Sequence, residues 1–205
     1  MARHDPTLAL LLGLVATCAV AHATGVDITV TDSKGRPLAD AVVMLEPVSG
    51  RLPIAPLSGV QIAQTGRQFR PQVTVLTVGT PVTFPNLDTV RHQVYSFSPT
   101  KAFELKLYAG VPAQPVVFDK PGIAVLGCNI HDQMVAWVVV VDTPLFARSA
   151  ASGKAQIVDV PPGSYELRTW HSTLNDATQP TTMPLLVGTA DVDLRVSLRV
   201  SGSPR

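Results

Sequence analysis

Hydrophobic and polar residues alternate in short runs along most of the chain, a pattern that predicts β-strands. In the run 26–31, Val and Ile alternate with Asp and Thr, and the run 187–200 contains the same alternation at Val192, Leu194, Val196 and Leu198. The run 134–141 is continuously apolar, which is typical of a strand buried on both faces. Turns that contain Pro and Gly separate the runs, as at 79–81 and 161–163. We therefore expect an all-β protein built from many short strands.

The other predicted strands share this alternation or are short apolar runs between turns. They are residues 41–45, 72–78, 82–84, 90–97, 116–118, 123–126, 154–160 and 165–170. Residues 48–60 are rich in Pro, Gly and Ser, which predicts a linker. The less regular segment 98–115 predicts a loop or a short helix.

The composition narrows the class of protein. Of the 205 residues, 46% are hydrophobic and 15% are charged, and the formal net charge is +1. The high fraction of hydrophobic residues excludes an intrinsically disordered chain. The low fraction of charged residues disfavours coiled coils and solvated helical bundles. The sequence contains no block of five or more like charges, so we expect no nucleic-acid partner.

The N-terminal segment predicts a secretory signal. A basic N-terminus precedes an apolar stretch, residues 8–20, that is too short to span a bilayer comfortably. The small residues Ala21 and Ala23 match the positions that a signal peptidase reads. We therefore expect residues 1–23 to be a cleavable signal peptide and the mature protein to be periplasmic, without a transmembrane segment.

The two cysteines have different expected fates. Cys18 offers an alternative processing route through lipid attachment, but Thr17 directly before it suits a lipoprotein site poorly. Once residues 1–23 are removed, Cys128 is the single cysteine of the mature chain, so no internal disulfide is expected. Because a free thiol is a liability in an oxidising compartment, Cys128 is either buried and inert or chemically occupied.

Cys128 begins the motif Cys128-x-x-His131-x-x-Met134, which places a thiolate, an imidazole and a thioether at intervals of three. With 5 His and 4 Met in 205 residues, this spacing follows a given cysteine by chance roughly once in 2,000. A fourth ligand, His92, can come from the strand predicted at 90–97. Two imidazoles, one thiolate and a weak thioether form the ligand set of a blue-copper site, whereas zinc prefers further Cys, His or carboxylate ligands. The sequence therefore predicts one copper ion at these four residues.

Two other interpretations of this region stay open. Cys128 can instead be a nucleophile with His131 as its base, but Met134 would then have no role. Polar residues near the ligands either orient them or simply form turns. These residues are Asn86, Asp88, Asn129 and Asp132.

The segment 61–141 resembles the cupredoxins, most closely the group of plastocyanin, pseudoazurin and amicyanin. The residues that carry the resemblance are Phe69-x-Pro71, Val78-x-x-Pro81-Val82-x-Phe84-x-Asn86-x-Asp88-x-x-x-His92-x-Val94, and Pro121-Gly122 ahead of the Cys-His-Met motif. The two-residue gap between His131 and Met134 matches the short loop of amicyanins, and Gln93 stands where many relatives have asparagine. The resemblance implies a cupredoxin-like Greek-key β-sandwich with one type 1 copper ion, with the ring edge of His131 in an apolar surface patch as the electron port.

The flanks carry a weaker resemblance. Residues 25–41 and 160–167 are similar to strands of carboxypeptidase-regulatory-like, transthyretin-like β-sandwiches. Since these two parts enclose the copper motif, we expect a cupredoxin domain over 58–141. It would be nested in a second small β-sandwich made from 24–57 and 142–205. Exported bacterial proteins of this layout are often labelled methylamine-utilisation proteins.

These features predict a periplasmic electron carrier that exchanges single electrons with a redox donor and acceptor. We expect no enzyme activity, because oxygen reduction at several coppers uses clustered histidines and the mature chain has only three. The main alternative is a copper storage or delivery protein, although the chain lacks the Met- and His-rich tracts typical of such proteins. A third possibility is an interaction module in which the metal only staples the fold, so that removing Met134 would change stability more than redox behaviour.

Overall fold

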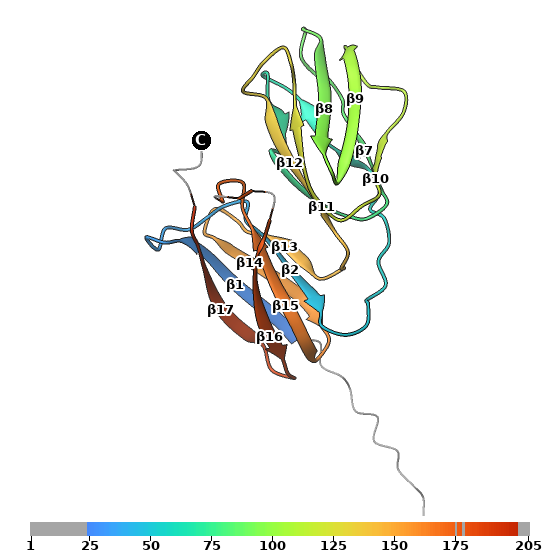
Figure 1. The fold of residues 1–205 in the computed structure, drawn as a ribbon. Coiled ribbons are helices and arrows are strands. Elements are labelled where there is room, and N and C mark those ends of the chain that lie inside the picture. Colours follow the sequence, from blue (N-terminus) through green and yellow to red (C-terminus); the bar gives the residue numbers. More distant parts are fainter. Residues whose placement is uncertain (1–23, 175, 178, 201–205) are drawn as a thin grey trace, which may run out of the picture.

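The computed structural model describes residues 24–174, 176, 177 and 179–200, and every regular element in these residues is a β-strand (Figure 1). The predicted all-β fold is therefore confirmed. The predicted signal peptide, residues 1–23 with Cys18, lies outside the described residues. Within the described part of the chain, no helix is long and apolar enough to cross a membrane.

Strands from the centre of the chain form what we call the middle sandwich. Its largest sheet has the order β6-β12-β11-β8-β9, and the sheets β10-β7-β3 and β4-β5 complete it. The strands are β3 (Val60–Gln61), β4 (Ala63–Gln64), β5 (Phe69–Arg70), β6 (Val73–Thr77), β7 (Thr80–Thr83), β8 (His92–Ser98), β9 (Lys101–Tyr108), β10 (Val116–Phe118), β11 (Gly122–Gly127) and β12 (Val135–Val141). The apolar run at 134–141 supplies β12, which pairs with β6 on one side and β11 on the other. This interior position explains why the run lacks polar residues.

Strands from both ends of the described chain form what we call the outer sandwich. Its sheets have the orders β14-β1-β17 and β13-β2-β15-β16. The strands are β1 (Thr24–Asp32), β2 (Val42–Pro47), β13 (Phe146–Arg148), β14 (Lys154–Val160), β15 (Gly163–Trp170), β16 (Thr181–Val187) and β17 (Val192–Leu198). The first and last strands, β1 and β17, pair in parallel from Val26↔Val192 to Asp32↔Leu198 (Figure 1).

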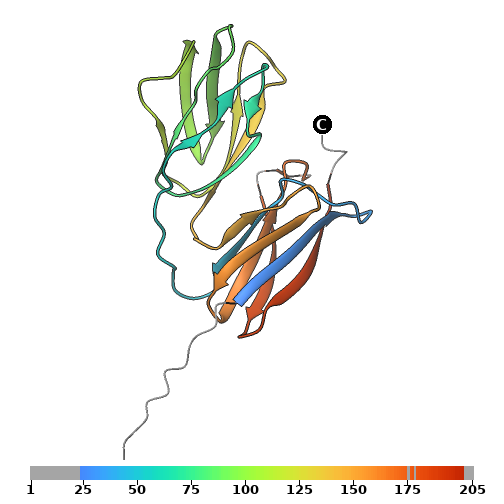
Figure 2. The ribbon, with the colours of Figure 1, turned by 180° about the vertical axis from the view of Figure 1, so that it is seen from behind.

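Two connections without strands join the sandwiches. Residues 48–59 lead from β2 to β3, and residues 142–145 lead from β12 back to β13. Figure 2, which shows the molecule from behind, shows that the first connection is a long loop beside both sandwiches. The membership of the sheets thus changes near the expected domain boundaries at 57/58 and 141/142. That each part is an independent folding unit stays a prediction.

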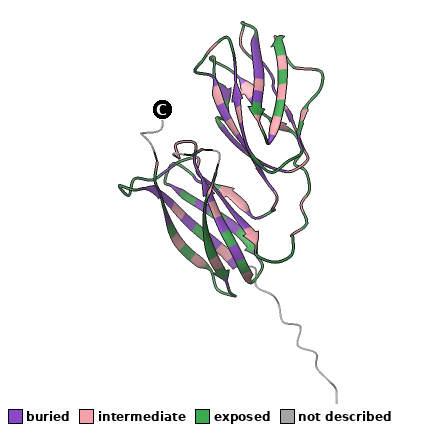
Figure 3. Cartoon of the chain, in the orientation of Figure 1, coloured by how far each residue is buried: buried purple, intermediate pink, exposed green. Residues whose placement is uncertain are grey.

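Three groups of buried apolar side chains stabilise this arrangement. Figure 3 shows that the strands of both sandwiches contain buried residues. The first fills the outer sandwich, and the second fills the middle sandwich and includes Cys128 and Met134. The third contains side chains of both sandwiches, among them Trp170, which is fully buried. Its members are Val42, Met44, Val73, Ile123, Val139, Val141 and Trp170. The shared apolar contact therefore links the two sandwiches beyond their covalent connections.

The expectation of a loop or short helix over 98–115 is wrong for its central part. Residues 101–108 form the edge strand β9, which pairs antiparallel with β8. Phe103 and Leu105 are half-buried and alternate with the exposed Glu104 and Lys106. The pattern has the period of a strand, but charged residues on the outer face and weak burial on the inner face make its apolar signal small.

Candidate metal centre

The middle sandwich brings His92, Cys128 and His131 together at one end of its main sheet. His92 begins β8, Cys128 directly follows β11, and His131 lies in the short loop that leads to β12. Strands β8 and β11 are neighbours in the sheet, with Gly127 opposite Tyr95. The ligand atoms of the three residues all lie within 4.8 Å of one another. The structure thus assembles three of the four predicted ligands from two distant parts of the chain.

Burial separates this cluster from ordinary surface residues. His92 is fully buried and Cys128 is 3% exposed, whereas His131 is half-buried. The two imidazole rings lie edge to face, with their centroids 5.1 Å apart. A polar histidine and a thiol in an apolar core need partners, because a buried polar group without a hydrogen bond costs free energy.

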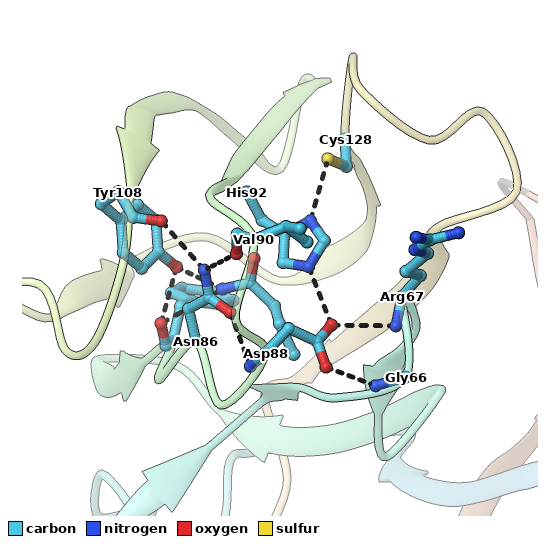
Figure 4. Close-up of polar contacts among 10 residues, drawn as sticks. Gly66, Arg67, Asn86, Asp88, Val90, His92, Tyr108 and Cys128 are labelled. Carbon is cyan, nitrogen blue, oxygen red and sulfur yellow. Dashed lines mark hydrogen bonds and ion pairs between the residues drawn. The ribbon is translucent and has the colours of Figure 1, made fainter.

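The orientation of His92 is set by Asp88 (Figure 4). Nε2 of His92 lies 2.8 Å from Oδ2 of Asp88, and Nδ1 lies 4.0 Å from Sγ of Cys128. A carboxylate accepts hydrogen bonds, so Nε2 carries the proton, and in the neutral imidazole the lone pair of Nδ1 then faces the thiol. The hydrogen bond from the backbone N–H of Arg67 is the main cause that holds the pKa of Asp88 below its ordinary value.

His131 has a buried ring nitrogen, Nδ1, that lacks a hydrogen-bond partner among the described residues. Leaving such an atom unsatisfied costs about 1–3 kcal/mol. One ring nitrogen of His131 lies in the cluster of donor atoms, and a metal ion bound there through Nδ1 would satisfy this buried atom together with the thiol of Cys128 and an imidazole nitrogen of His92. The residues present therefore fit a metal ion, and two imidazoles with one thiolate suit copper.

The comparisons with known proteins identify similar structures but no sequence family. No protein-family model matches the chain, and a search of curated proteins gives no match. A copper-containing nitrite reductase (NirK) from Thermus scotoductus SA-01 is 25% identical over 47% of this chain and 25% of its own, with a TM-score of 0.39. A purple cupredoxin from Nitrosopumilus maritimus is 26% identical over 40% of this chain and 99% of its own, with a TM-score of 0.36.

A reduced Cu(I) form of an amicyanin mutant is 17% identical over 48% of this chain and 98% of its own, with a TM-score of 0.38. A purple cupredoxin and an amicyanin, both from the group that the sequence resembles, are thus among the structures similar to this chain. Each of these three matches covers less than half of the present chain, and the nitrite reductase is matched over only a quarter of its own length. The choice of copper consequently rests on the donor atoms of the cluster.

Met134, the fourth predicted ligand, is 1% exposed and belongs to the same apolar group as Cys128. Its backbone N–H donates to the carbonyl oxygen of His131 at 2.9 Å, which closes the ligand loop. A thioether in this core fills space whether or not it touches a metal. The role of Met134 as a weak fourth ligand therefore stays a prediction.

The structure also shows which neighbouring residues act on the ligands. Asp88 contacts His92. The sequence alone allowed two roles for Asp88, either to orient a ligand or to form a turn. The backbone N–H groups of Gly66 and Arg67 hold Asp88, and no motif in the sequence singles these two residues out. The only sequence signal is the Gly at 66, which is compatible with a tight turn.

Gly127, directly before Cys128, lies against the ring of Tyr95. A Cβ at Gly127 would lie 2.6 Å from both Cζ and Oη of Tyr95, far inside a normal contact. We expect Gly127→Ala to lower the free energy of unfolding by about 1–3 kcal/mol, the usual cost of overpacking. Urea denaturation would measure this loss. In a Tyr95→Ala background the same substitution should cost much less, and an equal loss in both backgrounds would exclude the ring contact as its cause.

Proposed function

We propose that the protein carries single electrons by means of one type 1 copper ion held by His92, Cys128, His131 and Met134. The observation that supports this most directly is the convergence of two imidazoles and one thiol within 4.8 Å inside an apolar core. Copper held there supplies a one-electron couple between Cu(I) and Cu(II). The protein residues contribute a ligand geometry that is already formed around the position of the ion.

The positions of the ligands keep this geometry stiff. His92 and Cys128 are attached to neighbouring strands of one sheet, and the ligand loop between β11 and β12 is short. Fully packed surroundings resist displacement, so both oxidation states would find nearly the same arrangement of donors. A small rearrangement on gain or loss of an electron favours fast electron transfer.

His131 is the ligand that can connect the copper to a partner. Its side chain is half-buried and lines a surface hollow of about 360 Å³. Four exposed apolar residues lie in the loops that precede β8, follow β9 and contain the ligands. They are Leu87, Val90, Val111 and Ile130. We propose that these residues form the contact patch for a redox donor and acceptor, because a small apolar patch suits transient docking.

The storage or delivery alternative predicts different behaviour of the bound copper. An electron carrier should show a reversible one-electron wave in cyclic voltammetry and keep its copper in the presence of a Cu(I) chelator over many cycles. A delivery protein should instead release Cu(I) to the chelator soon after reduction.

The enzyme alternative has one specific reason to be tested, since one structural neighbour is a nitrite reductase. Turnover of nitrite by the copper-loaded protein with a reductant would contradict the carrier proposal.

Replacing Met134 distinguishes a redox site from a structural staple. Met134→Leu conserves volume, so we expect the free energy of unfolding to change by less than about 1.5 kcal/mol. Loss of the weak thioether should leave copper bound and blue but raise its reduction potential, because the axial ligand tunes that potential. Voltammetry and thermal unfolding of the same samples would measure both effects. A clear loss of stability with an unchanged potential would favour the interaction module.

We also propose that the protein is exported to the periplasm after removal of residues 1–23. The basic and apolar pattern of that segment and the small residues before position 24 support this. The mass of the protein recovered from a periplasmic extract should correspond to a chain that begins at Thr24. A lipid-modified chain that begins at Cys18 and fractionates with membranes would instead support the anchor alternative.

A further inference from the structure

Asp88 connects the first ligand to a turn of another sheet (Figure 4). Its Oδ1 accepts the backbone N–H of Gly66 at 2.7 Å, and its Oδ2 accepts the backbone N–H of Arg67 at 2.9 Å. The same Oδ2 lies 2.8 Å from Nε2 of His92. Both carboxylate oxygens are therefore engaged, and rotation of the side chain would break at least one of these hydrogen bonds.

The turn that holds Asp88 has an unusual backbone. Thr65 and Gln68 are joined by hydrogen bonds in both directions, of 3.0 and 3.2 Å, which leaves Gly66 and Arg67 as the two central residues of a hairpin turn. Gly66 and Arg67 have φ values of 60° and 56°, in the left-handed region. Arginine rarely adopts this conformation. In this turn, the conformation directs the successive backbone N–H groups of Gly66 and Arg67 toward the carboxylate of Asp88. The backbone of this turn therefore forms a binding site for the carboxylate of Asp88.

A second set of contacts holds Asp88 from its own loop. The backbone N–H of Asp88 donates to Oδ1 of Asn86 at 3.0 Å. Nδ2 of Asn86 donates to the carbonyl oxygens of Val90 and Tyr108, both at 2.9 Å. This network spans the loop from 86 to 92, so the carboxylate is placed before any ion binds.

We propose that Asp88 is a positioning residue for the metal, which fixes His92 with its proton on Nε2, directs Nδ1 toward Cys128 and lowers the reduction potential of bound copper. The part that concerns the potential rests on the proposed function. A carboxylate on the far nitrogen makes an imidazole a stronger donor, and a stronger donor favours Cu(II) over Cu(I). Groups that hold a ligand in this way typically account for about ten- to hundredfold in metal affinity.

Asp88→Asn tests the proposal because it removes the charge and keeps the shape. We expect Cu(II) affinity to fall by about ten- to hundredfold. If a tenfold loss is confined to Cu(II), the reduction potential rises by about 59 mV. In the metal-free protein, ¹⁵N NMR of the imidazoles should show His92 changing from one tautomer, protonated on Nε2, to a mixture. This last readout does not depend on copper.

Asp132→Asn is the matched control, because it removes one negative charge next to His131 from an exposed residue of the ligand loop. It should leave the tautomer of His92 unchanged and alter the potential much less than Asp88→Asn. If the two variants change the reduction potential equally, Asp88 acts on the copper only through its negative charge. If folded Asp88→Asn keeps the wild-type tautomer of His92, the positioning role is overturned.

If Asp88→Asn does not fold, Asp88→Glu keeps the charge and moves the carboxylate by one methylene. We expect this variant also to mix the His92 tautomers and weaken Co(II) binding, and wild-type values for both would overturn the proposal. A wild-type protein that binds Co(II) in the same cluster but shows no blue Cu(II) form would contradict the electron-carrier proposal while leaving the test of Asp88 valid.

Discussion

Replacing Cys128 with serine is expected to abolish the blue colour of the copper-loaded protein completely. The intense visible band of a type 1 site arises from charge transfer between a thiolate and Cu(II), and Cys128 supplies the one thiol of the cluster. Its side chain is 3% exposed and its Sγ lies 4.0 Å from Nδ1 of His92, and a thioether such as that of Met134 cannot form a thiolate in its place. Cu(II) affinity should fall by more than about a hundredfold, since substitutions outside the ligands already cost up to that amount.

Absorption and EPR spectra of the Cu(II)-loaded wild type and the Cys128→Ser variant would measure this. The wild type should combine the intense band with narrow copper hyperfine splitting. Serine is nearly isosteric with cysteine, so circular dichroism of the metal-free variant should match the wild type and exclude unfolding as the cause. A wild-type protein that stays colourless with copper, or a serine variant that keeps the band, would contradict the site.

Replacing Trp170 with alanine is expected to be the most damaging single change to the stability of the fold. Trp170 is fully buried, and its Nε1–H donates to the carbonyl oxygen of Ala177 at 2.7 Å. It belongs to the buried apolar group that also contains Val42 and Met44 of the outer sandwich and Ile123 of the middle sandwich. Truncating a buried tryptophan typically costs about 3–5 kcal/mol, because apolar contacts are lost and a cavity remains.

This substitution should also separate the unfolding of the two sandwiches. Trp170 lies in the apolar group that joins them, so its loss weakens their coupling more than either individual core. Urea denaturation followed by circular dichroism and by the fluorescence of Trp137 should then give two transitions with different midpoints. Trp137→Phe is the matched control, because Trp137 lies at the same junction, with its ring 6.4 Å from that of Trp170, but is only half-buried. A single coincident transition with a loss below about 1 kcal/mol would show that the junction contributes little.

The ligand loop is the part of the site that the sequence could predict well. Cys128, His131 and Met134 lie within seven consecutive residues, so a short loop between two apolar strands brings them close wherever it folds. The donor types then select copper over zinc because of their chemistry. Strand β9 is hard to predict for the opposite reason, because it is an edge strand whose inner face is weakly buried and its apolar signal is small.

The class of fold and the metal chemistry follow from the sequence, since strand periodicity and the Cys-His-Met spacing are local properties. The tertiary structure alone decided which strands pair, because a period of two leaves the partner of each strand open. It placed β1 beside β17 and set the turn at Gly66 and Arg67 against Asp88. These contacts join residues far apart in the chain, and only packing of the whole sheet selects them. The orientation of His92 therefore could not be read from its neighbours in sequence.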